Sequence, residues 1–183
     1  MQIGFQVSSL RDHTKTADGV MTSFKKIKSI GYDIVQVQYI DNAVKAEDIK
    51  SALSASGLTC IGTQDDYPYS LSHIDDIIAK NALWEGSDIC SALWPMDCIS
   101  EDNLIIMDKY ESFAGEMATA AKKVQAAGKK FSFHPLFFDL KPTDGIIPLD
   151  FLLENIPDMK IVLDIYHVIM AGLDPVSIIN KYS

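Results

Sequence analysis

A carboxylate and an imidazole follow an apolar run near the end of the sequence. The run Met159–Leu163 is followed directly by Asp164 and then by His167. A short run rich in Ile, Val and Leu predicts a strand buried on both faces of a parallel sheet, where chemistry gathers at the carboxyl ends of the strands. Asp offers an oxygen ligand or a base, and His offers a nitrogen ligand or a group that titrates near neutral pH. The structural alternative is that Asp164 caps the following turn and His167 is a packed or surface residue.

The elements that must position this pair alternate between strand and helix. Apolar runs predict strands over residues 3–7, 34–38, 58–62, 89–94, 130–134 and 160–164. Apolar residues at helical spacing predict helices over residues 20–27, 46–53, 74–84, 107–124 and 149–154, and Asp174-Pro175 opens a last one. Gly31, Gly57 and Gly128 stand where three of the helices should end.

Six alternating units leave two architectures, a doubly wound sheet or part of a (β/α)8 barrel. The first strand is followed by neither Gly-x-Gly-x-x-Gly nor Gly-x-x-x-x-Gly-Lys, the glycine patterns of nucleotide-binding folds. The pattern therefore favours the barrel.

Composition limits the classes of function. The chain of 183 residues has 48% hydrophobic and 22% charged residues, which predicts one globular domain over residues 1–183. A net charge of −9 argues against nucleic acid as a partner and favours a small molecule. Cys60, Cys90 and Cys98 lack zinc-site spacing and are expected to be reduced packing residues. Without a signal segment or a membrane-length apolar run, a cytoplasmic protein that does not enter the membrane is expected.

Five segments resemble, in order, parts of the sugar phosphate isomerase/epimerase family, the xylose isomerase-like TIM barrels of the AP endonuclease family 2 superfamily. They are Ile3–Asp12, Ile30–Gln36, Phe131–Phe138, Leu163–His167 and Ala171–Val176. The resemblance implies an α/β, TIM-barrel-like fold. The chain holds about six β/α units, so an incomplete barrel, short at its C-terminal side, is expected.

The family's activity implies a divalent cation, Mn, Mg or Zn, and metal-dependent proton transfer between adjacent carbons of a small sugar or sugar phosphate. Asp164 matches the family's sixth-strand metal ligand, and His167 matches a position that contacts substrate or a second metal. The fifth-strand ligand position falls at Ser132, and His134 points to the same side of that strand. His134 and His167 are therefore the predicted catalytic residues, and Asp164 is the predicted metal ligand.

Three further residues are predicted to bind substrate. The second-strand position, commonly Glu in the family, is Gln36, and the third-strand position, where His is common, is Gln64. Neither amide can act as a carboxylate base. Trp94, at a strand end, is predicted to form an apolar wall for a sugar ring, with core packing as the alternative.

The differences between this sequence and the family's site residues leave other functions open. The family's seventh-strand His and eighth-strand Glu have no counterpart in the 183 residues. One alternative is a catalytically inactive, truncated barrel that binds a sugar-like ligand or serves as a structural dimer. A less favoured one is an apurinic-site endonuclease, which needs more than four His and a basic face. Exposed edges of the first and sixth strands predict a homodimer that covers them.

Overall fold

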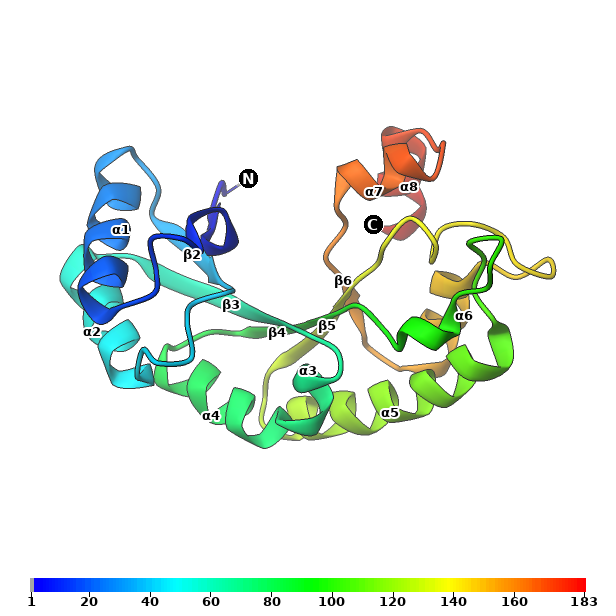
Figure 1. The fold of residues 1–183 in the computed structure, drawn as a ribbon, viewed down its shortest axis with the longest axis horizontal. Coiled ribbons are helices and arrows are strands. Elements are labelled where there is room, and N and C mark those ends of the chain that lie inside the picture. Colours follow the sequence, from blue (N-terminus) through cyan, green and yellow to red (C-terminus); the bar gives the residue numbers. More distant parts are fainter. Residues whose placement is uncertain (1) are drawn as a thin grey trace. The chain divides into compact units, whose positions relative to one another are not determined.

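The computed structural model describes residues 2–183 and contains one parallel sheet whose six strands follow the order of the sequence. The strands are β1 (Phe5–Gln6), β2 (Ile34–Val37), β3 (Thr59–Asp66), β4 (Asp88–Ala92), β5 (Lys130–His134) and β6 (Lys160–Ile161). Each predicted strand is present (Figure 1). The third extends beyond its predicted end at residue 62, so Gln64 lies within β3.

Helices separate the strands, as the apolar spacing predicts. They are α1 (Ala17–Ser29), α2 (Ala46–Ser56), α3 (Tyr69–Ser72), α4 (Ile74–Leu83), α5 (Met107–Ala126), α6 (Pro148–Asn155), α7 (Ile165–Met170) and α8 (Pro175–Tyr182). The predicted start of the last helix is confirmed, because the Asp174 carboxylate accepts the Ser177 N–H at 2.8 Å. The short helices α3 and α7 are not predicted, because one or two turns carry too little periodicity to recognise.

The chain divides into two compact units. Unit 1 comprises the chain up to Asp65 together with Asp75–Ile89, and unit 2 comprises Asp66–Ile74 and Cys90–Ser183. In unit 1 the helices α1 and α2 pack side by side (Figure 1). Their buried faces join the apolar residues of the nearby strands in one core, which includes Val20, Phe24, Val35, Leu53 and Trp84.

The core of unit 2 is built on α5. Its apolar stripe is buried, as the spacing predicts, through Tyr110, Phe113, Ala114, Met117, Ala120, Ala121 and Val124. The Phe113 ring lies 6.1 Å from that of Phe133, a fully buried residue of β5. This packing fixes β5 on α5 and so fixes the segment that follows β5.

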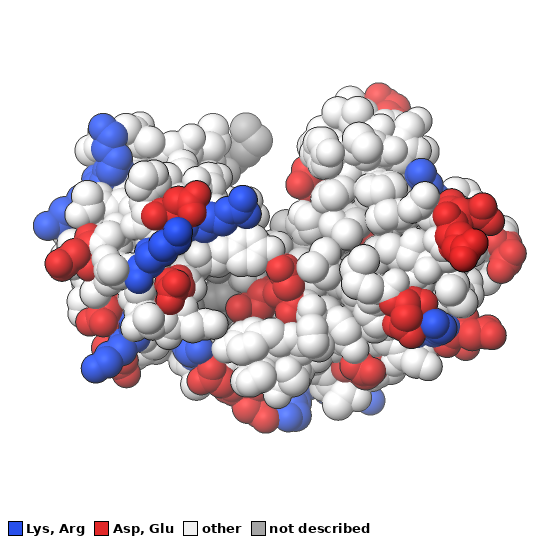
Figure 2. Space-filling view, viewed as in Figure 1, with Lys and Arg blue, Asp and Glu red and all other residues white. Residues whose placement is uncertain are grey.

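The surface agrees with the acidic composition. On the face that Figure 2 shows, Lys and Arg side chains lie among Asp and Glu over unit 1, whereas Asp and Glu predominate over unit 2. Within residues 2–183, no helix has both the length and the apolar character that crossing a membrane requires.

Candidate functional site

The sixth strand ends earlier than the sequence predicts. β6 stops at Ile161, and Asp164 is the N-cap of α7, where its Oδ1 accepts the Tyr166 N–H at 2.8 Å. The predicted strand as far as Asp164 is therefore wrong by three residues, and the capping alternative is confirmed. Asp is a favoured N-cap because its side chain satisfies a free backbone N–H in the first turn. The cap also fixes the direction in which α7 carries His167.

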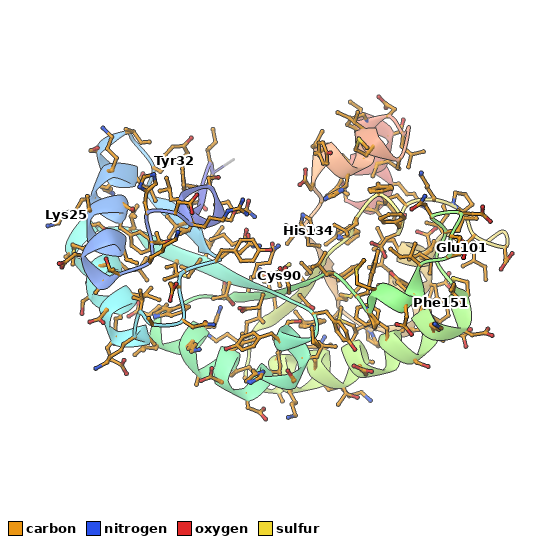
Figure 3. The ribbon with its side chains drawn as sticks, viewed as in Figure 1. Lys25, Tyr32, Cys90, Glu101, His134 and Phe151 are labelled. Carbon is orange, nitrogen blue, oxygen red and sulfur yellow. The ribbon has the colours of Figure 1, made fainter. Side chains whose placement is uncertain are left out.

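Strand pairing brings His134 to Asp164. β5 and β6 pair in parallel, and the Val162 N–H extends the ladder by donating to the Phe133 carbonyl at 2.9 Å. His134, the last residue of β5 (Figure 3), then lies with its Nε2 3.6 Å from Asp164 Oδ2. The His134 side chain is 12% exposed and that of Asp164 is 42% exposed, so the pair is open on the carboxylate side.

His167 completes a cluster of three possible metal ligands. One ligand atom from each of His134, Asp164 and His167 lies within 4.8 Å of the others. The two imidazole rings meet edge to face, with centroids 5.6 Å apart. These three residues, called the His–Asp cluster below, include both predicted catalytic residues and the predicted metal ligand.

Two ring nitrogens of the cluster lack hydrogen-bond partners within the described part of the chain. The Nδ1 atoms of His134 and His167 are both buried without one. An unsatisfied buried polar atom costs about 1–3 kcal/mol. Two imidazoles and a carboxylate are also a donor set that zinc and similar transition metals accept, whereas magnesium prefers oxygen ligands. The residues present therefore fit a divalent metal.

Both imidazoles are biased toward the neutral form. Burial lowers the pKa of His134, against the opposing pull of the Asp164 carboxylate. Burial also lowers the pKa of His167, and the neighbouring His134 lowers it further. A neutral imidazole at pH 7 can ligate a metal or accept a proton.

The two predicted glutamines lie together in unit 1. Gln36 Nε2 donates to Gln64 Oε1 at 3.5 Å, and Gln6 Nε2 donates to Gln36 Oε1 at 3.2 Å. Ser8 Oγ donates to Gln6 Oε1 at 3.1 Å. Gln6, Gln36 and Gln64, the amide row, lie toward the carboxyl ends of β1, β2 and β3. Sequence reasoning missed Gln6, although its register partner on β2 is Gln36.

Trp94 has a structural partner. Its side chain is 3% exposed, and its indole Nε1 donates to the Asp139 carboxylate at 2.9 Å. The ring therefore has little free surface, because the core of unit 2 covers it, and a direct contact with substrate stays a prediction. Asp139 itself was missed, since an acid within Phe138-Asp139-Leu140-Lys141 carries no sequence signal of burial.

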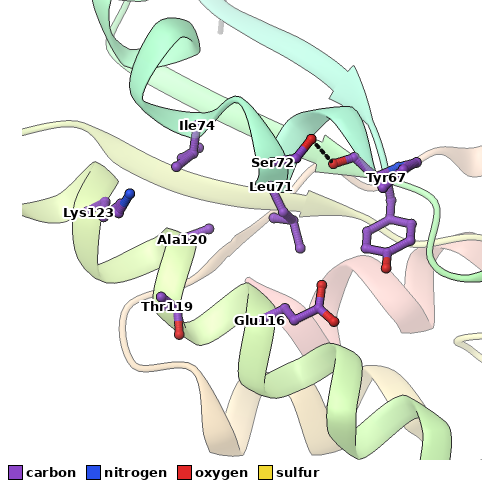
Figure 4. Close-up of a pocket in the computed structure, with 9 residues that line it drawn as sticks. Tyr67, Leu71, Ser72, Ile74, Glu116, Thr119, Ala120 and Lys123 are labelled. Carbon is purple, nitrogen blue, oxygen red and sulfur yellow. Dashed lines mark hydrogen bonds between the residues drawn. The ribbon is translucent and has the colours of Figure 1, made fainter.

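A separate cavity of unit 2 lies between α3 and α5 (Figure 4). It has a volume of about 320 Å³ and an apolar lining that includes Leu71, Ile74 and Ala120, with Tyr67 and Glu116 at one end. None of the predicted site residues lines it, so it is distinct from the His–Asp cluster.

Comparison with known proteins identifies the fold. No protein-family model matches the sequence, and no curated protein matches it either. Three solved structures resemble it closely in shape. A sugar phosphate isomerase/epimerase from Parabacteroides distasonis has a TM-score of 0.75 at 16% identity, over 99% of this chain and 71% of its own. An L-ribulose 3-epimerase has a TM-score of 0.76 at 15% identity, over 100% of this chain and 67% of its own. A xylose isomerase-like TIM barrel protein from Mycobacterium smegmatis in complex with magnesium has a TM-score of 0.73 at 9% identity, over 100% of this chain and 72% of its own.

The predicted fold class is confirmed. The chain has the xylose isomerase-like TIM-barrel fold and comprises six of the eight strands of a closed barrel. Identities of 9 to 16% establish the fold alone.

Proposed function

We propose that this protein binds a divalent cation at the His–Asp cluster and moves a proton between adjacent carbons of a small sugar or sugar phosphate. The observation that carries the proposal is the His134 Nε2 that faces Asp164 Oδ2 at 3.6 Å, with a ligand atom of His167 in the same cluster. Two structures of the same fold belong to a sugar phosphate isomerase/epimerase and an L-ribulose 3-epimerase, and a third is in complex with magnesium.

The proposal gives the cluster residues separate roles. Asp164 and His134 hold the cation, since their side chains already face each other. A cation there would polarise a carbonyl or hydroxyl oxygen of the substrate. His167 accepts the proton from one carbon and returns it to the adjacent carbon, because burial lowers its pKa and favours the neutral imidazole while the ring stays only partly buried.

The amide row binds substrate hydroxyls. Side-chain amides both donate and accept hydrogen bonds, which suits neighbouring hydroxyl groups. Since Gln36 and Gln64 do not titrate, they orient the substrate and leave proton transfer to an imidazole.

Hydrogen exchange at carbon tests these roles. Wild-type protein with Mn²⁺, Mg²⁺ or Zn²⁺ is incubated in D₂O with ketopentoses, ketohexoses and their phosphates, and NMR follows deuterium incorporation beside the carbonyl. We expect one sugar class to exchange, His167→Gln to lose exchange, and the metal affinity of that variant to remain within about tenfold of wild type. Exchange that survives in His167→Gln would contradict the assigned base.

A second candidate is a metal-free sugar-binding protein. The absence of any acid from the amide row favours it, because no carboxylate is present there to share proton transfer. A sugar that raises the melting temperature equally in EDTA and in metal, with no exchange at carbon, would support this candidate over the first.

The homodimer also stays a prediction, and light scattering at micromolar concentration measures it directly.

A further inference from the structure

Asp139 is a fully buried acid outside the His–Asp cluster. It lies in the segment after β5, and its exposed fraction is 0%. Burial raises the pKa of its carboxyl to about 6. Since a buried carboxylate is costly unless it is well hydrogen-bonded, its partners indicate why it is kept there.

Three donors from three segments converge on this carboxylate. Trp94 Nε1, after β4, and the Tyr110 hydroxyl, on α5, donate to Oδ1 at 2.9 and 2.5 Å. The Leu136 N–H, two residues beyond β5, donates to Oδ2 at 2.7 Å. The Asp139 side chain therefore ties the ends of β4 and β5 to α5.

The backbone before Trp94 is strained. Leu93 has φ 63°, a left-handed conformation that costs a branched apolar residue free energy. Such strain persists only where the surroundings over-determine the conformation, and it concentrates at functional sites. Here the next residue is fixed twice, since the Trp94 ring bonds Asp139 and packs edge-on against Phe138 with centroids 5.6 Å apart.

The segment held by Asp139 forms a wall of the His–Asp cluster. It begins directly after His134, and its Phe137 ring stacks on His167 at 6.2 Å with 20° between the planes. The ring centroid of Phe137 in turn lies 3.8 Å from that of Phe138, the ring that contacts Trp94. A continuous set of contacts thus leads from Asp139 to the proposed base.

We propose that Asp139 is a positioning residue for the cluster: its carboxylate holds Leu136 and Trp94 so that Phe137 keeps the His167 imidazole in its working orientation. This role rests on the proposed function, because it concerns the base assigned there. Asp139 acts through other residues and touches no reacting atom. A carboxylate suits the position because all three of its partners are donors, whereas an amide would turn its own N–H₂ toward one of them.

Asp139→Asn tests the role against a matched core variant, Val124→Ala, which removes buried volume from α5 away from the segment. We expect Asp139→Asn to speed amide hydrogen exchange at Leu136 by about tenfold or more, since the amide loses its acceptor. The ring resonances of His167 should shift, and kcat should fall about tenfold to a hundredfold with little change in KM. Val124→Ala should lower the melting temperature without moving these readouts.

The resonance and exchange measurements need no turnover, so they separate this proposal from the proposed function. If the wild type proves inactive but Asp139→Asn still shifts His167, positioning stands and the reaction is wrong. If Asp139→Asn only lowers the melting temperature, as Val124→Ala does, positioning is overturned. Should Asp139→Asn fail to fold, Trp94→Phe keeps an aromatic side chain and removes the indole donor, and an unmoved His167 resonance in that variant would equally reject the proposal.

Discussion

The amide row of unit 1 and the His–Asp cluster of unit 2 both lie toward the carboxyl ends of parallel strands, but their polar atoms find partners differently. In the row, each glutamine is hydrogen-bonded to another glutamine. In the cluster, the Nδ1 atoms of His134 and His167 have no partner among the described residues.

This difference separates two kinds of polar site. Neutral amides that satisfy one another need no ligand to be stable, and they carry no charge that pH could change. Buried imidazoles without partners weaken the folded state until a cation or a proton acceptor engages them. The cluster is thus the region expected to respond to metal and to pH, and the row is expected to be indifferent to both.

Removing the cluster's carboxylate should have the largest effect. Asp164→Ala should weaken Zn²⁺ or Mn²⁺ binding more than about a hundredfold, beyond the loss typical of an outer-shell partner. It should also cost about 1 kcal/mol of stability as a lost N-cap. Isothermal titration calorimetry and urea unfolding measure the two effects.

Asp174→Ala is the matched control for that variant, because Asp174 is the N-cap of α8 and, like Asp164 in α7, accepts a backbone N–H of the first turn. It should lose similar stability while keeping the metal affinity of wild type. Equal metal binding by both variants would remove Asp164 from the site.

A charge placed in the amide row should break its indifference to pH. Gln36→Glu loses the donor to Gln64 Oε1, and we expect a cost of about 1–3 kcal/mol at pH 8 from the facing oxygens. The destabilisation of the ionised form raises the folded-state pKa of the new acid, so stability should fall as pH rises from about 4 to that pKa. Urea unfolding at pH 4.5 and 8 checks this, with Gln36→Ala as the uncharged control that should show equal losses at both pH values.

The smallest effect is the net pH dependence of the metal-free wild type, in which two contributions oppose each other. The lowered pKa values of His134 and His167 mean that the unfolded chain binds protons first, so their contribution to stability is lost as pH falls below about 6.5. Asp139 acts oppositely, because its raised pKa makes the folded state bind the proton first and stability decrease from about pH 4 to 6.

Unfolding curves in EDTA separate the two contributions, and that of Asp139 is expected to reach about 3 kcal/mol, because its folded-state pKa of about 6 lies well above the ordinary value of an aspartate. Replacing both histidines by Gln should flatten the rise in the free energy of unfolding with pH near pH 6. Asp139→Asn should make the free energy of unfolding rise more steeply between pH 4 and 6, because the opposing contribution of Asp139 is gone. A wild-type curve that both changes leave unaltered would mean that none of these groups titrates differently on folding.

Sequence reasoning recovered the repeating elements better than the local geometry of the site. Alternating apolar runs, helix spacing and Gly57 and Gly128, which adopt left-handed φ values of 65° and 72°, report local preferences and are visible in one segment at a time. The order of the six strands followed from that alternation.

The missed features depend on contacts between distant segments. Ser132, the family's fifth-strand ligand position, is 1% exposed, and the imidazole that reaches Asp164 comes from His134 instead. Gln6 joins the amide row only through strand register, and Asp139 is recognisable only once Trp94 and Tyr110 face it. No single segment carries this information, so the partners of these side chains required the structure.

The attachment of α8 has a consequence for how the molecule breaks down. No residue of α8 is buried. The helix is hydrogen-bonded to α6 through Lys181 and Tyr182, which both donate to the Asp150 carboxylate. A helix with so little buried apolar surface opens at a free energy far below that of global unfolding. Limited proteolysis should therefore begin around Gly172–Asp174, and because His167 precedes that point, the first cleavage product would still contain all three residues of the His–Asp cluster.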